Sequence, residues 1–142
     1  MNLTAHFTYE ELYASEIADR NKIDNEPKEQ WIKDNLFTLA QNLEAVRRLL
    51  GYPIHVNSAY RNEQVNTLLG SKPTSAHTKG LAADIICPAF GSPRDIVVAI
   101  IGSGIQYDQV ILEYDRWCHI GFGDTVQRLQ KLIIDKNGTS PF

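Results

Sequence analysis

The sequence predicts a single α+β domain spanning residues 1–142, in which helices flank a small antiparallel sheet. The chain has 142 residues, of which 43% are hydrophobic and 22% are charged, the balance of one ordinary globular domain. Apolar residues recur at helical spacing early in the chain and alternate as in strands later, with no repeat or linker between them. A domain of this length buries roughly 70% of its unfolded surface, so it needs no metal or disulfide merely to fold.

The first helix is predicted from its N-terminal signals. Thr8 and Glu11 have the spacing of a capping box, in which each side chain bonds the other residue's backbone N–H. Phe7 and Leu12 supply the hydrophobic staple that fixes how the chain enters the helix. We therefore expect a helix from Glu11 to about Arg20.

A longer helix follows the break at Pro27 and forms the scaffold of the predicted domain. It begins at Lys28 and ends at Gly51, a residue type that favours helix C-termini. Its apolar residues recur at helical spacing: Trp31, Ile32, Leu36, Leu39, Ala40, Leu43, Val46 and Leu50.

The middle of the chain alternates between strand and helix signals. Residues 53–58 alternate as a strand does, and residues 62–69 form a short helix closed by Gly70. A polar loop at 71–79 then leads into residues 81–86, an apolar run expected to form a buried strand.

The last third of the chain predicts one helix and a group of strands. Ser92 caps a helix that has Pro93 at its first position and Gly102 just past its end. Three strands are then predicted, at residues 109–114, 117–122 and 130–135. The first two form a hairpin, whereas the third is alternatively the extension of a helix.

Charge and hydropathy exclude two classes of partner. The net charge is −3, and the 14 basic residues are spread along the chain with no run longer than Arg47-Arg48, so we expect no nucleic-acid binding. No run approaches the ~18 apolar residues of a membrane span, and the N-terminus lacks a basic leader and an apolar stretch. We expect synthesis in the cytoplasm without a signal peptide, and no membrane insertion.

The counts of possible metal ligands restrict the kind of site. Cys87 and Cys118 are the only cysteines, too few for a disulfide framework or a four-thiolate zinc site. We expect them to be reduced and buried, with a single bridge as the alternative. Because the chain has only four histidines, a metal site would have to recruit a carboxylate.

Asp84 is the candidate carboxylate, since it interrupts the apolar run 81–86. A buried carboxylate costs several kcal/mol without a cation or hydrogen-bond donors, so either a buried ion pair or a metal must compensate it. His77 lies in the preceding loop, and Gly80 between them allows the chain to fold back.

His119 is the third candidate ligand. Along its strand, Cys118 and Ile120 share one face, whereas His119 and Gly121 share the other. If the first face packs on the core, His119 projects into a cleft. Two imidazoles and a carboxylate are a donor set of catalytic zinc, with the fourth position left to water.

Five segments together resemble a known family. They are Leu3-Thr-Ala-His-Phe-Thr-Tyr-Glu-Glu11, Ser58-Ala-Tyr-Arg-Asn-Glu-Gln-Val-Asn66, Thr74-Ser-Ala-His-Thr-Lys-Gly-Leu-Ala-Ala-Asp-Ile85, Asp108-Gln-Val-Ile-Leu-Glu113 and Trp117-Cys-His119. They resemble the M15 zinc peptidases, in the bacterial and phage branch that contains D-Ala-D-Ala carboxypeptidases and L-alanyl-D-glutamate endopeptidases. The resemblance covers nearly the whole chain and implies a Hedgehog/DD-peptidase-like fold.

The resemblance also assigns residues to roles. It implies that His77, Asp84 and His119 bind one Zn²⁺ per chain, and that Arg61 holds a carboxylate or carbonyl of the peptidoglycan stem peptide. The planar guanidinium of Arg61 is suited to bidentate recognition of a carboxylate. Ser75 is expected to contact substrate as well.

The general base departs from the commonest pattern of the family. Many relatives carry an acidic residue three positions before the last histidine, where this chain has Arg116. The candidates are Glu113 and, as the alternative, Asp115. A three-residue hairpin loop would pair Glu113 with Trp117 on the face of His119, whereas a two-residue loop would turn Glu113 away. We predict Glu113.

The expected function is therefore that of a zinc metallopeptidase, an endolysin-like peptidoglycan hydrolase. We expect a monomer that acts on the bacterial cell wall, with the resemblance suggesting a phage or prophage source. The sequence leaves open whether it is a carboxypeptidase or an endopeptidase. The alternative is a non-catalytic cell-wall-binding or virion module that keeps the fold and the metal.

Overall fold

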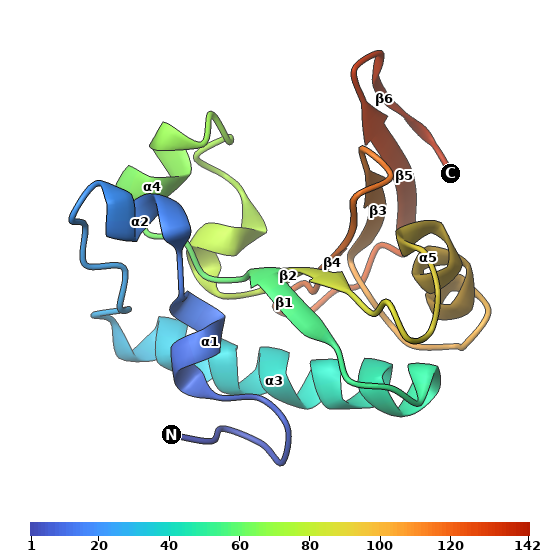
Figure 1. Ribbon diagram of the computed structural model, residues 1–142, viewed down its shortest axis with the longest axis horizontal. Coiled ribbons are helices and arrows are strands. Elements are labelled where there is room, and N and C mark those ends of the chain that lie inside the picture. The colour runs from blue at the N-terminus through green and yellow to red at the C-terminus, as the bar shows by residue number, and fades with distance from the viewer.

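A six-stranded sheet organises this α+β domain, and the computed structural model describes residues 1–142 (Figure 1). The helices are α1 (Tyr9–Tyr13), α2 (Glu16–Arg20), α3 (Gln30–Leu50), α4 (Glu63–Leu68), α5 (Pro93–Ile101) and the short 3₁₀ helix η1 (Ala76–Lys79). The strands are β1 (His55–Ser58), β2 (Ala82–Ile86), β3 (Gln109–Glu113), β4 (Trp117–Gly121), β5 (Gln130–Asp135) and β6 (Gly138–Pro141). None of the helices combines the length and the apolar character that a membrane span requires.

The sheet is mixed, whereas the sequence predicted an antiparallel one. Its strand order is β1-β2-β4-β3-β5-β6. All neighbours are antiparallel except β3 and β5, which run parallel. The reason is topological: β4 is already flanked by β2 and β3, so β5 cannot pair with the strand it follows and joins the free edge of the adjacent β3. The chain leaves β4 at the end where β3 begins, and β5 therefore runs in the direction of β3.

The long helix α3 forms as its periodicity predicted. Its buried residues are Ile32, Leu36, Leu39, Ala40, Leu43, Val46 and Leu50. Gly51 ends the helix in the left-handed conformation, with φ of 77°. Trp31 departs from the predicted stripe, because its side chain lies on the outer face and is 53% exposed. The helix runs along the bottom of Figure 1, beneath β1 and β2.

The first predicted helix is divided into α1 and α2. The capping box of Thr8 and Glu11 is present, and Leu12 is fully buried. The interruption has a local cause, since the Ser15 side chain accepts a hydrogen bond from the backbone N–H of Ala18 and so caps a new helix.

The C-terminal tail forms a hairpin of β5 and β6. The strand expected at 130–135 is confirmed as β5, which excludes the alternative of a helical extension. β6 was not predicted, because every residue of it is exposed and it shows no apolar alternation. Asn137 donates its backbone N–H to the side chain of Asp135 at 2.8 Å, and this contact stabilises the turn between the strands.

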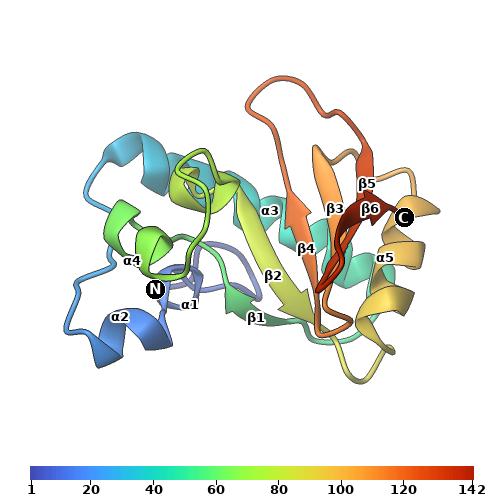
Figure 2. The same cartoon turned by 90° about the horizontal axis from the view of Figure 1, so that it is seen from above.

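The central strands separate a core face from a polar face. Ala83 and Ile85 of β2, with Cys118 and Ile120 of β4, belong to the hydrophobic core, which α3 and α5 complete. The view from above shows α3 passing behind these strands (Figure 2). Both cysteines are buried and free, as expected. The alternate residues of the two strands face the opposite side.

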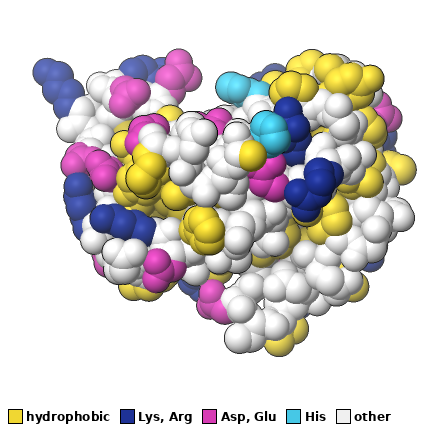
Figure 3. Space-filling model, turned by 90° about the horizontal axis from the view of Figure 1, so that it is seen from below, with side chains coloured by type: hydrophobic (Ala, Val, Ile, Leu, Met, Phe, Trp, Pro, Cys, Tyr) yellow, Lys and Arg dark blue, Asp and Glu magenta, His cyan; other side chains and the backbone are white.

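The outer surface carries mixed charge on the face seen from below. There, acidic and basic side chains are interspersed and hydrophobic side chains form separate groups (Figure 3). This distribution agrees with the net charge of −3 and the scattered basic residues of the sequence.

Gly80 supplies a test of the packing between η1 and α3. Its φ is +72°, and an added Cβ would lie 3.2 Å from both the Ile32 carbonyl oxygen and the Leu36 Cγ. Gly70 is a matched control, because its φ is +73° but nothing lies within 4 Å of the same position. Each alanine variant should lose about 1–2 kcal/mol from left-handed backbone strain.

Gly80→Ala should lose at least ~1 kcal/mol more than Gly70→Ala, since its methyl group must also displace well-packed atoms. Urea unfolding of the metal-free variants measures the difference. Equal losses for the two variants would contradict the close approach of η1 to α3.

Candidate metal centre

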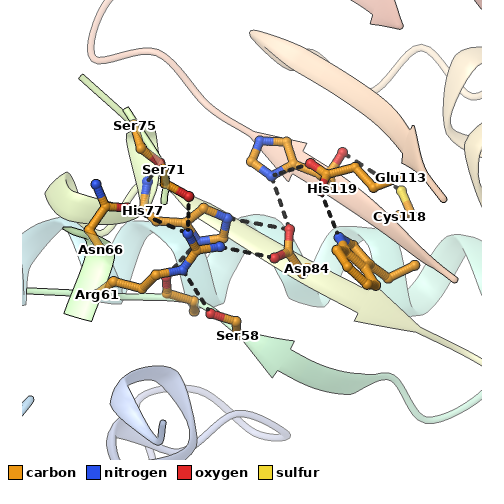
Figure 4. Close-up of polar contacts among 12 residues, drawn as sticks. Ser58, Arg61, Asn66, Ser71, Ser75, His77, Asp84, Glu113, Cys118 and His119 are labelled. Carbon is orange, nitrogen blue, oxygen red and sulfur yellow. Dashed lines mark hydrogen bonds and ion pairs between the residues drawn. The ribbon is translucent and has the colours of Figure 1, made fainter. Parts of the chain in front are cut away.

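Asp84 lies at the centre of a buried polar cluster on the polar face of the sheet (Figure 4). Its side chain is 6% exposed. The Oδ1 atom is 3.3 Å from Nε2 of His77 and 3.0 Å from Nδ1 of His119, whereas Oδ2 accepts a hydrogen bond from Nη2 of Arg61 at 3.3 Å. The structure thus brings together the three residues predicted as metal ligands.

The pairing of β2 with β4 places His119 beside Asp84. The two residues are direct partners in the antiparallel register, so their side chains leave the sheet on the same face. Gly121 follows on that face, and a Cβ there would lie 3.4 Å from Nε2 of His119. The absent side chain leaves room beside the imidazole.

His77 is oriented by two hydrogen bonds, one at its backbone N–H and one at its ring. It lies in η1, where the Ser75 side chain accepts a hydrogen bond from the His77 backbone N–H at 3.3 Å. Its ring Nδ1 is 2.6 Å from the carbonyl oxygen of Ala59, which can only accept, so Nδ1 carries the proton. The lone pair of Nε2 then faces Asp84. Metal-binding histidines are commonly held in this way.

The protonation states suit metal binding. Burial lowers the pKa of His77, although the charge of Asp84 opposes the effect. Burial alone would raise the pKa of Asp84, but His77 and His119, in their protonated forms, hold it well below its usual range. A neutral imidazole and an ionised carboxylate are the forms in which these groups bind metals.

The spacing of the donor atoms fits a zinc ion. One donor atom from each of His77, Asp84 and His119 can be chosen so that all lie within 4.8 Å of one another. Zinc bonds of ~2.1 Å in tetrahedral geometry separate neighbouring ligand atoms by roughly 3.4 Å. The distances of 3.3 and 3.0 Å around Asp84 are close to this value. Three protein ligands leave one coordination position open, as in catalytic zinc sites.

Glu113 lies beside this cluster, at the end of β3. The hairpin loop has three residues, and Glu113 pairs with Trp117, which places Glu113 on the face of His119 as predicted. Its Oε1 is 3.7 Å from Nδ1 of His119. Burial, with the charge of Asp84 adding to it, raises the pKa of Glu113.

Asp115, the alternative base, is not brought to the cluster. It lies in the hairpin loop with its side chain 76% exposed, and its nearest charged partner is Arg94 of α5, at 3.8 Å. Arg116, which occupies the position where many relatives carry an acid, is also exposed. Of the acidic residues weighed from the sequence, only Glu113 therefore adjoins the metal ligands.

Arg61 is buried, and its guanidinium is directed inward. Nε donates to the Ser58 hydroxyl at 3.2 Å, and Nη1 donates to Ser71 at 3.0 Å and to Asn66 at 3.5 Å. The contact of Nη2 with Asp84 was missed by sequence reasoning, as were Asn66 and Ser71. No local pattern in the sequence indicates that Asn66 and Ser71 bind Arg61, because the chain brings them together only through the turn that follows α4.

The comparisons with known proteins agree with this site. A sequence model of the family described as Peptidase M15 matches residues 5–121. The match ends with the last residue of β4 and so contains every residue of the cluster, leaving β5 and β6 outside. No curated protein matches the chain.

Replacing His77 or His119 with alanine should abolish stoichiometric zinc binding, since two protein ligands hold zinc poorly. His55→Ala is the matched control, because His55 lies exposed on β1 and should leave the zinc content unchanged. Plasma mass spectrometry measures the metal, and circular dichroism measures the fold. Both should show folded protein in every variant, because the hydrophobic core is independent of the site. Unfolding of the unaltered chain on zinc removal would contradict this separation.

Proposed function

The chain belongs to the M15 peptidases, a zinc-dependent family, and from this premise we propose that it hydrolyses peptide bonds in the stem peptide of peptidoglycan. The observation that carries the proposal is the position of Glu113 beside the buried cluster of His77, Asp84 and His119. The choice of substrate is supported by the resemblance of the motifs around these residues to those of the bacterial and phage branch.

The chemistry divides between the metal and the chain. When bound to His77, Asp84 and His119, zinc supplies Lewis acidity that polarises a carbonyl and lowers the pKa of water toward ~7. Glu113 acts as the general base, taking a proton from the attacking water and passing it to the leaving amine. The raised pKa of Glu113 suits this exchange, because a base with a pKa nearer neutrality also serves as the acid.

Arg61 is proposed to hold the substrate, and its hydrogen bonds within the protein determine how many of its N–H groups are available for this. A guanidinium has five N–H donors, and four hydrogen bonds to Ser58, Ser71, Asn66 and Asp84 use all but one of them. The remaining N–H is on Nη2, next to Asp84. It suits a single carbonyl or carboxylate oxygen. Bidentate binding of a carboxylate would require Arg61 to break one of its hydrogen bonds within the protein.

Ser75 is proposed as a further substrate contact. It is half-buried at the start of η1, next to the loop that presents His77. Its hydroxyl accepts from the His77 backbone N–H, so its own hydrogen remains available to a substrate acceptor.

Hydrolysis of purified peptidoglycan tests the proposal. The zinc-loaded chain should release new amino groups, and both a chelator and the His119→Ala variant should abolish the release. Mass analysis of the products identifies the bond: loss of terminal D-Ala indicates a carboxypeptidase, whereas free stem peptides indicate an endopeptidase. Absence of products from the zinc-loaded chain, with casein or other peptides cut instead, would contradict the choice of substrate.

Glu113→Gln tests the general base. The variant should keep its zinc and its fold but lose about 10²- to 10⁴-fold in kcat, the usual contribution of a positioned acid–base group. Asp115→Asn is the control, since Asp115 is exposed and lies apart from the cluster. Normal turnover in Glu113→Gln, together with a loss in Asp115→Asn, would move the role to Asp115.

A further inference from the structure

Trp117 contacts the proposed base through a polar atom. It begins β4 as the direct partner of Glu113. Its indole Nε1–H donates to Oε2 of Glu113 at 3.1 Å. The other oxygen of the same carboxylate, Oε1, faces Nδ1 of His119 at 3.7 Å. The two oxygens of Glu113 are therefore directed to different neighbours, Oε2 to Trp117 and Oε1 to the metal ligand His119.

The indole is a rigid donor in a fixed place. It has a single polar atom that donates and cannot accept, so it holds a carboxylate oxygen in one orientation. Its ring lies against Tyr114, with centroids 6.0 Å apart and planes tilted by 52°. The backbone of Tyr114 is anchored to β5, since its N–H donates to the Ile134 carbonyl at 2.8 Å. The hairpin loop, which is bonded to β5, therefore supports the Trp117 indole that donates to Glu113.

A glutamate without such a contact has several rotamers at the end of a strand. The charged groups around it act in opposite directions, since Asp84 repels the carboxylate whereas Arg61 attracts it. We propose that Trp117 is a positioning residue: its indole N–H fixes one oxygen of Glu113 so that the other faces the metal ligands. The inference rests on the proposed function, since it takes Glu113 as the base.

Trp117→Phe tests the role in turnover, because phenylalanine keeps an aromatic ring against Tyr114 but has no donor. A hydrogen bond to a charged group that is lost in this way corresponds to about a 10- to 100-fold fall in kcat. KM should stay within about twofold and the zinc content should not change, since the variant alters neither the substrate contacts nor the ligands. Trp31→Phe, on the exposed face of α3, is the control and should match the unaltered chain.

The result for Glu113→Gln separates two kinds of failure. If Glu113→Gln loses activity but Trp117→Phe keeps its kcat within about twofold, the positioning role is overturned and the base assignment stands. If Glu113→Gln itself turns over normally, the base assignment fails first. In the double variant, Trp117→Phe should add little to the loss caused by Glu113→Gln, because Trp117 acts only through Glu113.

A second measurement is independent of activity and of the metal. The chain has two tryptophans, so Trp31→Phe leaves the Trp117 indole as the only one, and its N–H proton can be followed by nuclear magnetic resonance. Its exchange with solvent should be severalfold slower with Glu113 present than in Glu113→Ala, which removes the acceptor. Equal exchange in the two proteins would overturn the contact, and with it the inference.

Discussion

The buried charge of Asp84 is the constraint around which the site is arranged. A carboxylate between apolar neighbours on a central strand is costly unless other groups compensate it. The chain does so with Arg61, His77 and His119, which come from three separate segments. Because the charge of Arg61 is permanent, Asp84 keeps a cationic partner whether or not a metal is bound. We therefore expect folding to be independent of metal binding in this domain, which also has a hydrophobic core on the opposite face of the sheet.

Much of the site was predictable because strand geometry is strictly periodic. Alternation placed His119 and Cys118 on opposite faces, and the structure has one in the polar cluster and the other in the core. The loop length decided the face of Glu113 by the same rule. The helical periodicity of α3 and the capping box at Thr8 are also local signals, and both were confirmed.

The features that sequence reasoning missed are those without a local pattern. The contact between Arg61 and Asp84 joins residues from two separate segments of the chain. The sequence around each of them gives no indication of the other. β6 is exposed throughout, so no apolar alternation marked it. The parallel pairing of β3 with β5 depends on which sheet edge is still free, a property of the assembled fold rather than of either strand.

The three-residue loop of the β3–β4 hairpin also restricts how this chain can change over evolutionary time. Tyr114 and Asp115 both have positive φ there. Opposite residues of an antiparallel pair share a face, so inserting one residue on either side of the loop, with the loop itself kept at three residues, would move Glu113 to the side occupied by the core. Inserting two residues there would keep Glu113 on the face of His119. The pairing register of this hairpin, rather than any individual residue in the loop, therefore keeps Glu113 on the side of the metal ligands.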